Sequence, residues 1–284
     1  ANIIHSNGKF YLLVGTSTSN RDHFYIVDAK TLYYENSAVV GANLSGLTIL
    51  NEQYGLVTGD GIRRIDLKSL NNVRIKNERL LCFYNSIIYN GKVLSNDTYK
   101  DESKVKYYDV NELIAAKEGE APAVTELDII QKQKINFVLA KDGNVYTLES
   151  ADNGCNIVKI KNDFTLEKVF ANFQPAKGPY HSSPTIGMVA SETENIIYLV
   201  STDGAIYKYI LGDSDSLKAP FIAAESGVSI TAPLQLNQQS GELYVTYTEE
   251  RKDESKIVVY SKDGKVLHTV DCGESVPSQI LFNN

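Results

Sequence analysis

The chain has no tryptophan, a single methionine and only three cysteines among its 284 residues. Cys82, Cys155 and Cys272 stand far apart and form neither a C-x-x-C pair nor a zinc-finger spacing. An odd and scattered set of this kind predicts free thiols that are buried as small apolar side chains. We therefore expect neither a disulfide framework nor a cysteine metal site.

Long apolar runs and clustered basic residues are also missing. No run of about 18 apolar residues occurs, so we expect no transmembrane segment in this chain. The 28 Lys and Arg residues are outnumbered by 35 Asp and Glu, which gives a formal net charge of −7. Phosphate binding needs clustered Lys and Arg, and the sequence shows no basic stripe. We therefore expect no nucleic-acid partner.

Motifs of the common enzyme classes are absent as well. The four histidines, His5, His23, His181 and His268, are scattered along the chain, with no i,i+4 pair and no H-E-x-x-H. The sequence contains no G-x-S-x-G, no P-loop and no G-x-G-x-x-G. These absences argue against a zinc protease, a serine hydrolase and a nucleotide-binding enzyme. We expect no metal site of this kind, no catalytic residue and no cofactor.

Short apolar runs separated by glycine turns are what the sequence does contain. In residues 55–70 (GLVTGDGIRRIDLKSL), two β-type runs flank Gly59-Asp60-Gly61, whose glycines can supply the positive φ angles of a tight hairpin. Asp66 then precedes a polar turn that is closed by Leu70. Similar units recur at residues 24–32, 105–113, 157–166, 205–211 and 256–266.

The recurrence has a measurable period. The residue before the Asp, or its equivalent, steps by 38, 43, 52, 49 and 51 positions through Val27, Ile65, Tyr108, Ile160, Tyr209 and Tyr260. A repeat of about 40 to 50 residues has room for four short strands and is typical of propeller blades. We therefore predict an all-β fold, a β-propeller of four-stranded antiparallel blades, formed by residues 1–284 as a single domain.

Two segments refine this prediction. Residues 109–120 (DVNELIAAKEGE) alone have a helical composition, and we expect one short helical turn there. After six full units, residues 276–282 have the pattern of a further strand, which we expect to close the ring. Either strands supplied from before Ala1 complete a seventh blade, which we favour, or residues 1–7 and 276–284 share one blade of a six-bladed ring.

Asp28, Asp66 and Asp109 recur at the same place in three units. An Asp side chain at such a place accepts a hydrogen bond from the backbone two residues later and closes the turn. We therefore interpret these three residues as structural and not as catalytic.

Function is expected on the face where the longer loops meet. In a propeller, the links between blades and the loops between second and third strands lie at one end, and loops on a rigid scaffold carry function. The longest link is residues 171–184 (ANFQPAKGPYHSSP), which is rich in rings and prolines. For each candidate, the alternative is an ordinary solvated loop residue. The predicted ligand contacts are Phe173, Tyr180, His181, Arg21, His23, Tyr84, Asn85, Tyr99, Asn153 and Arg251.

The repeat unit resembles that of a known family. An apolar strand, an N-G-K or D-G turn, an L-Y-V strand and a closing I-x-x-I/Y-D-x-K-T/S-L are similar to the YncE-like β-propellers of the Bacteroidota, of the DUF5074 type. The best-matching passage is residues 243–270, followed by the P-S-Q-I-L-F of residues 277–282. The Asp that is missing from units four to six and the absent tryptophan depart from the pattern. The resemblance implies a cell-surface or periplasmic protein, in some members a lipoprotein, and one branch captures cobalamin for an outer-membrane transporter.

Two functions of different classes are therefore compared. The favoured one is a non-enzymatic binding protein on the extracellular face of the outer membrane or in the periplasm. Its loop-rich face would take a small ligand, such as a cobalamin-like molecule, or a protein partner such as an outer-membrane transporter. The alternative is a metal-dependent propeller hydrolase, lactonase or lyase. Its axial metal would need three or four Asp, Asn, Glu or His side chains from separate blades.

Overall fold

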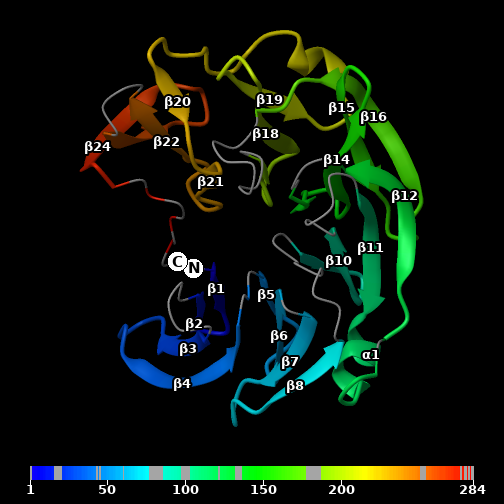
Figure 1. Ribbon diagram of the computed structural model, residues 1–284. Coiled ribbons are helices and arrows are strands. Elements are labelled where there is room, and N and C mark those ends of the chain that lie inside the picture. The colour runs from blue at the N-terminus through cyan, green and yellow to red at the C-terminus, as the bar shows by residue number, and fades with distance from the viewer. Residues whose placement is uncertain are drawn as a thin grey trace. The chain divides into compact units, whose positions relative to one another are not determined.

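Glycine turns join the strands of six antiparallel sheets, as the repeat predicts (Figure 1). The structure is a computed structural model. It describes residues 2–282 except 16–20, 43, 45, 60, 77–85, 97–102, 121, 132–135, 177–186, 250–253, 276, 278, 279 and 281. The described chain divides into two compact units, residues 1–134 and residues 135–282, and each contains three of the sheets.

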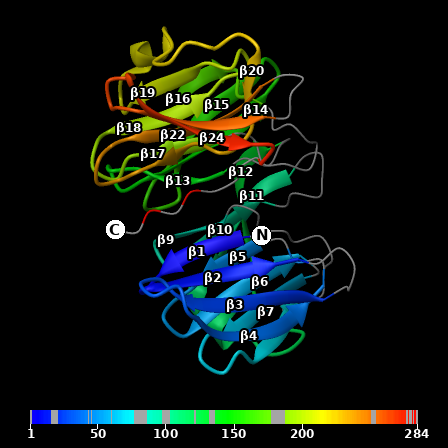
Figure 2. The same cartoon turned by 90° about the vertical axis from the view of Figure 1, so that its left-hand side faces the viewer.

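Unit 1 holds three four-stranded sheets, which we call blades 1 to 3. Blade 1 consists of β1 (Asn2–Ser6), β2 (Lys9–Val14), β3 (Asp22–Asp28) and β4 (Tyr34–Gly41). Blade 2 consists of β5 (Gly46–Ile49), β6 (Tyr54–Gly59), β7 (Gly61–Asp66) and β8 (Asn72–Lys76). Blade 3 consists of β9 (Ile87–Tyr89), β10 (Lys92–Asn96), β11 (Ser103–Asp109) and β12 (Thr125–Gln131), with α1 (Val110–Ala115) between the last two strands. Figure 2 shows β1 to β4 side by side in chain order.

Unit 2 holds blades 4 to 6, which are less regular. Blade 4 consists of β13 (Val138–Leu139), β14 (Val145–Ala151), β15 (Gly154–Ile160) and β16 (Leu166–Phe173). Blade 5 has three strands, β17 (Met188–Ala190), β18 (Ile196–Val200) and β19 (Ile206–Ile210), followed by the 3-10 helix η1 (Ser214–Leu217). Blade 6 consists of β20 (Val228–Ile230), β21 (Gln235–Leu236), β22 (Leu243–Glu249), β23 (Ser255–Tyr260) and β24 (Val266–Gly273). Both β20 and β21 pair with β22, so together they form one interrupted inner strand.

The predicted fold class is confirmed, and the described residues form six blades and not the favoured seven. Strand β1 pairs with β2 inside blade 1, so a blade shared by residues 1–7 and 276–284 is not seen among the described residues. The ring-closing strand expected at residues 276–282 is not found among the described residues of that segment, because Pro277, Ile280 and Phe282 form no strand. Instead, Thr246 Oγ1 donates to the Pro277 carbonyl at 3.4 Å, and the rings of Tyr244 and Phe282 lie 5.0 Å apart. The single domain over residues 1–284 stays a prediction.

The structural interpretation of the three recurring aspartates is confirmed. Oδ1 of Asp28 accepts hydrogen bonds from the backbone of residues 30 and 31, and Oδ1 of Asp66 does the same for residues 68 and 69. Oδ1 of Asp109 accepts from the backbone of residues 111 and 112 and caps α1, the short helix that the sequence predicts. An aspartate at the same place in each of the three blades therefore begins a connection, and these connections differ in shape.

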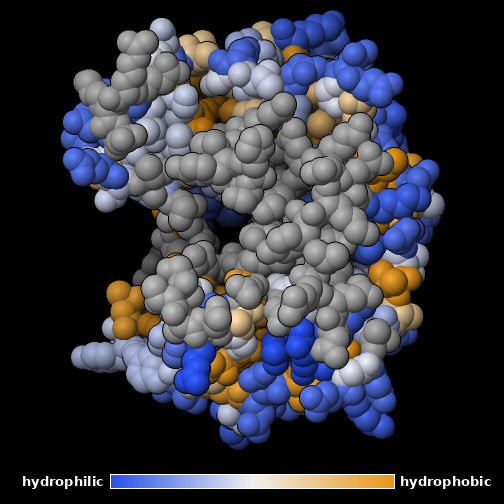
Figure 3. All heavy atoms as spheres, viewed as in Figure 1, coloured by the Kyte–Doolittle hydropathy of each residue, from blue (hydrophilic) through white to orange (hydrophobic). Residues whose placement is uncertain are grey.

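Neighbouring blades of one unit pack through alternating apolar side chains. In unit 1, Leu13 and Phe24 of blade 1 share a buried cluster with Val57 and Ile65 of blade 2. Unit 2 repeats this arrangement between blades 4 and 5 and between blades 5 and 6. Each fully buried side chain of this size contributes roughly 1.5 to 3 kcal/mol relative to its exposure to water. The visible outer surface of each unit is mostly hydrophilic, with some hydrophobic patches (Figure 3).

Candidate functional site

One end of each blade carries the features expected of the functional face. We call it the loop end, where the second strand passes to the third and the outer strand leaves for the next blade. The opposite end, with the turns between first and second strands, is called the turn end. Long parts of the loop-end connections lie outside the described residues, so the site is built from the described part of each unit.

In unit 1, a buried carboxylate joins two connections at the loop end of blade 1. Asp22 is 3% exposed, and its Oδ2 accepts a hydrogen bond from the backbone N–H of Leu44 at 2.5 Å. A hydrogen bond to an ionised acceptor is stronger than one between neutral groups. It fixes the link from β4 to β5 against β3. Arg21 precedes this anchor and is exposed, and His23 follows it, with its ring stacked on Tyr25 at 5.9 Å.

Two arginines lie opposite each other at the loop end of blade 2. Arg63 on β7 and Arg74 on β8 are directly paired in the antiparallel ladder, and both are half-buried. Glycines make room for them: a Cβ at Gly41 would lie 3.0 Å from Nε of Arg63, and a Cβ at Gly61 would lie 3.2 Å from Nε of Arg74. Nη1 of Arg63 also donates to Oδ1 of Asn72 at 3.2 Å. Arg63 therefore reaches from blade 2 to the end of β4 in blade 1.

Lys76 lies two residues further along β8, beyond a shift in the register between the Arg63–Arg74 and Ile62–Lys76 pairs. It is half-buried, like Arg74. Arg63, Arg74 and Lys76 together are called the basic cluster. The sequence shows no basic stripe here, because Arg63 and Arg74 are 11 positions apart. The β7–β8 hairpin, which the sequence does predict, was the signal that could have placed residues 63 and 74 opposite each other.

In unit 2, two of the predicted ligand contacts are joined by a third residue. Asn153 lies in the turn from β14 to β15, and its carbonyl accepts a hydrogen bond from Nε2 of Gln174 at 2.6 Å. The Gln174 amide lies so close to Gly154 that a Cβ on this glycine would fall 2.4 Å from Nε2 of Gln174. Phe173 is 6% exposed and packs edge-on against Tyr207, with ring centroids 5.9 Å apart.

The same link continues along the loop end of blade 5. The carbonyl of Gln174 accepts from the N–H of Thr202 at 2.9 Å, and the N–H of Ala176 donates to the carbonyl of Val200 at 2.9 Å. The start of the long 171–184 connection is therefore held by backbone hydrogen bonds to the turn of the next blade. This places Asn153, Gln174 and the residues 201–204 turn at one edge of unit 2.

The structure describes four of the ten predicted ligand contacts. Arg21 and His23 lie in unit 1 at the same end as the basic cluster, and Asn153 and Phe173 lie together in unit 2. Phe173 is a packing residue within the described structure, because its ring is covered. The other six lie outside the described residues: Tyr84, Asn85, Tyr99, Tyr180, His181 and Arg251.

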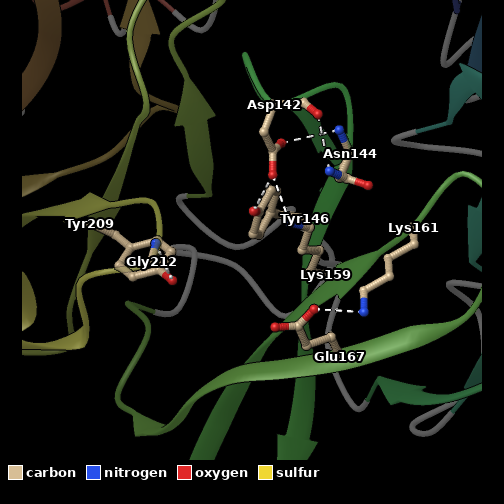
Figure 4. Close-up of polar contacts among 8 residues, drawn as sticks. All are labelled: Asp142, Asn144, Tyr146, Lys159, Lys161, Glu167, Tyr209 and Gly212. Atoms are coloured by element: carbon tan, nitrogen blue, oxygen red, sulfur yellow. Dashed lines mark hydrogen bonds and ion pairs between the residues drawn. The ribbon is translucent and has the colours of Figure 1, made fainter.

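Titratable groups in the turn-end half of blade 4 are held in fixed protonation states (Figure 4). The hydroxyl of Tyr146 donates to Oδ2 of Asp142 at 2.8 Å, and Nζ of Lys159 contacts the same oxygen at 2.8 Å. Burial, followed by the hydrogen bond to Asp142, raises the pKa of Tyr146. Burial alone would raise the pKa of Asp142, but the bonds from Lys159 and Tyr146 outweigh it and lower this pKa. At neutral pH the Asp142 carboxyl group is therefore ionised and the Tyr146 hydroxyl is protonated.

The other resolved pKa shifts among the described residues also point away from neutrality. Burial raises the pKa of Cys155 to about 11 and that of Tyr198 to about 12. The side-chain hydrogen bond from Ser201 lowers the pKa of Asp203 at the loop end of blade 5. General acid–base catalysis is most effective when the pKa lies near the working pH. The described groups with a resolved shift are therefore poorly suited to proton transfer at neutral pH.

Two absences apply only to the part of the chain that the structure describes. No three or more His, Cys, Asp and Glu side chains gather there in a group that could hold a metal ion. Neither is any described helix both long enough and apolar enough to span a membrane.

Solved structures that are similar to this chain include a β-propeller domain. The β-propeller domain of Cps50 (Swd1) from Myceliophteria thermophila is 12% identical, with a TM-score of 0.55, over 98% of this chain and 91% of that domain. Hsv2 from Kluyveromyces lactis is 11% identical, with a TM-score of 0.54, over 95% and 85% of the two chains. TolB from Acinetobacter baumannii is 10% identical, with a TM-score of 0.53, and the match covers 94% of this chain but 65% of TolB. At these identities the likeness shows the fold alone.

Sequence comparison identifies the family. No curated protein matches the chain significantly. The family model described as a domain of unknown function, DUF5074, matches residues 2–283, and the chain therefore belongs to this family.

Proposed function

We propose that this chain is a non-enzymatic binding protein whose loop end takes a small ligand or a protein partner. The ordering of the loop end carries the proposal: Oδ2 of Asp22 accepts from the Leu44 N–H in unit 1, and the Gln174 amide donates to the Asn153 carbonyl in unit 2. The lowered pKa of Asp203, at the same end, lies away from neutral pH, which disfavours proton transfer by this group.

Fixed connections at the loop end support the same proposal. The Asp22 carboxylate holds the β4–β5 link in unit 1, and the Gln174 amide holds the β14–β15 turn in unit 2. A surface that is ordered before the ligand arrives loses less conformational entropy on binding. We expect ligand contacts to form beside these anchors.

The proposal also covers where the protein acts and which ligand and partner it binds. Resemblance of the repeat unit to YncE-like propellers of the Bacteroidota supports a location at the cell surface or in the periplasm. On the same grounds, cobalamin is the first small ligand to test, and an outer-membrane transporter is the first partner. The similarity to TolB, Hsv2 and Swd1 supports the propeller fold of this surface.

A thermal unfolding screen against cobalamin, oligosaccharides and short peptides tests the binding function. A ligand that binds only the folded protein adds about 2.7 kcal/mol of stability at 100 times its dissociation constant. A matched pair of variants then places the site. Gln174→Ala removes an amide that bonds a carbonyl at the loop end, whereas Gln238→Ala removes one that bonds the Ala190 carbonyl at the turn end.

We expect Gln174→Ala to weaken binding of the ligand found in the screen and Gln238→Ala to leave it unchanged. Equal effects of the two variants would contradict a site at the loop end. The alternative function, a metal-dependent hydrolase, lactonase or lyase, instead predicts that the purified protein contains a metal. A stoichiometric divalent metal, together with turnover that is lost on chelation, would replace the binding function by that enzyme.

A further inference from the structure

We propose that the loop end of unit 2 binds a neutral saccharide through three amide side chains and one carboxylate. Asn153, Asn172, Gln174 and Asp203 supply these groups and together are called the polar site. The inference rests on the proposed binding function and names the chemical class of the ligand. It concerns unit 2 alone.

Gln174 brings three connections of the loop end together. Its Nε2 donates to the carbonyl of Asn153 at 2.6 Å and to that of Asn172 at 3.5 Å. Its own carbonyl accepts from the backbone N–H of Thr202 at 2.9 Å, and Asp203 is the next residue. The turn after β14, the end of β16 and the turn after β18 therefore meet around one residue.

The backbone is irregular at Asn172. Its φ of +63° is a left-handed conformation that few residues other than glycine adopt. The residue lies where the register of β15 and β16 shifts, between the Ile157–Phe170 and Cys155–Phe173 pairs. Such irregularities redirect a side chain and are frequent next to active sites. This observation supports a ligand-contacting place for the Asn172 amide.

The side chains of the polar site have hydrogen-bonding capacity left for a ligand. All four residues are exposed. Within the described part of the chain, the side-chain amides of Asn153 and Asn172 make no hydrogen bond. Each amide offers two N–H donors and a carbonyl acceptor. Oδ1 of Asp203 accepts from the Ala205 N–H at 3.0 Å and from the Ser201 hydroxyl, so Oδ2 can accept from a ligand.

Neighbouring hydroxyl groups of a sugar ring match this set of donors and acceptors. One hydroxyl can donate to the Asp203 carboxylate while the next accepts from an amide N–H. Beside the site, the half-buried ring of Tyr207 packs edge-on against Phe173 and offers an apolar surface to the C–H face of a sugar. The polar site itself contains no cation, and the Asp203 carboxylate would repel an anionic ligand group. The ligand is therefore expected to be neutral.

Isothermal titration of the whole chain with maltohexaose, cellohexaose and mannohexaose tests the proposal. We expect at least one of these neutral probes to bind with a dissociation constant below about 1 mM. Asn172→Gly deletes an amide and keeps a backbone that glycine adopts readily, so it should weaken the binding roughly two- to tenfold. Asp203→Asn keeps an acceptor oxygen for the turn but loses the charge, and it should weaken the binding roughly tenfold.

Asn7→Gly is the matched control. Asn7 is also an exposed asparagine with a positive φ, +50°, but it lies in the turn from β1 to β2, at the turn end of unit 1. This variant should change the affinity less than about twofold, because the residue is far from the polar site in the fold of its own unit. Hexaglycine, which carries peptide amides without side chains, should not bind. If one of the two site variants fails to fold, the other supplies the comparison.

The proposal is overturned if none of the three saccharides binds, if a folded site variant binds as tightly as the unaltered chain, or if Asn7→Gly weakens binding as much as the site variants. Binding of hexaglycine but of no saccharide would overturn it in favour of a peptide ligand. These failures differ from a failure of the binding function. A ligand of another class whose affinity falls in Gln174→Ala would keep the binding function and reject the saccharide.

Discussion

Leu32 and Leu70 occupy the same position of the same turn, four residues after a capping aspartate, and both have a φ of +59°. Leu70 is 6% exposed and belongs to the apolar cluster between blades 1 and 2. Leu32 is 69% exposed. Leu113, four residues after Asp109, is fully buried against blade 2. In blades 2 and 3 this leucine therefore packs on the preceding blade, and blade 1 has no preceding blade in unit 1.

This series predicts unequal costs for one substitution. Leu70→Ala should lower the free energy of unfolding by roughly 2 to 5 kcal/mol, because it opens a cavity in a packed cluster. Leu32→Ala should change it by no more than about 0.5 kcal/mol, as at other exposed positions. Urea unfolding of both variants measures the difference. Similar losses in the two variants would mean that Leu32 is covered in solution.

Acid should weaken the turns that the aspartates cap. Backbone hydrogen bonds, first of all from Ser69, lower the pKa of Asp66, and the side-chain and backbone bonds of Thr31 lower that of Asp28. A carboxyl group with a lowered folded-state pKa stabilises the fold above its unfolded-state pKa of about 3.9, and this contribution is lost as the pH falls through the folded-state value. Stability should therefore decline below about pH 4.

Unfolding by urea at pH 7 and at pH 3 measures that decline, and Asp66→Asn isolates one turn. The amide cannot ionise, so the variant should be less stable than the unaltered chain at pH 7 and should lose less on acidification. Asp128→Asn is the control, because that side chain is 87% exposed and its ion pair is long, at 3.5 Å. A pH dependence that Asp66→Asn leaves unaltered would show that this turn does not contribute.

Arg64 clamps the end of α1 from the neighbouring blade. Its Nη1 donates to the carbonyl of Ala116 at 3.0 Å and to that of Ile114, and its guanidinium lies 5.2 Å from the ring of Tyr54. Carbonyls at a helix end lack partners within the helix, so this arginine supplies one from outside. Arg64→Ala should destabilise the protein by roughly 1 to 3 kcal/mol.

Hydrogen exchange checks where that loss occurs. The amides of α1 and of the following connection should exchange faster in Arg64→Ala, whereas those of blade 1 should not change. Lys168→Ala provides a control for loss of a cation, because its ammonium contacts Glu149 at 3.4 Å and is 55% exposed. Uniformly faster exchange throughout unit 1 would contradict a local clamp.

The sequence predicts well the features that depend on neighbouring residues. It predicts less well the features that depend on pairing between segments far apart in the chain. The glycine turns, the capping aspartates and the short helix after Asp109 depend on neighbouring residues, and all are confirmed. The fourth strand of blade 5 is missing because Asp213 caps the 3-10 helix η1 there, and Ile222 makes only a bridge to Ile206. An apolar run such as residues 276–282 looks like a strand, but it needs a pairing partner that the sequence does not specify.

The same limit applies to the candidate site. The ring of Phe173 and its place in a long link predict a ligand contact, and that contact stays a prediction; the structure adds that β16 extends to Phe173 and that its ring packs against Tyr207. Arg63 and Arg74 are 11 positions apart in the sequence and become neighbours only through the register of β7 and β8. The loop end as the functional end therefore stays a prediction from the sequence, and the side chains that meet at that end become apparent only from the strand register.

Alkali should destabilise the protein through its buried tyrosines. Burial raises the pKa of Tyr198 to about 12, and burial with the hydrogen bond to Tyr260 raises that of Tyr247 further. An acidic group with a raised folded-state pKa stabilises the fold fully below its unfolded-state pKa, which is about 10 for tyrosine, and this contribution is lost as the pH rises above it. The free energy of unfolding should therefore fall between about pH 10 and pH 12.

Tyrosinate absorbance, followed during a pH titration, measures this directly. Tyr198, Tyr247 and Tyr146 should remain protonated at pH 11 in the folded protein and ionise only as it unfolds. Tyr247→Phe removes one such group and leaves Tyr260 without its hydroxyl partner at 3.0 Å, so it should cost about 1 kcal/mol at pH 7 and less at pH 11. Tyr33→Phe, at a position 77% exposed, should alter neither value. Ionisation of all tyrosines in one step below pH 11, with the fold intact, would contradict the burial that shapes these blades.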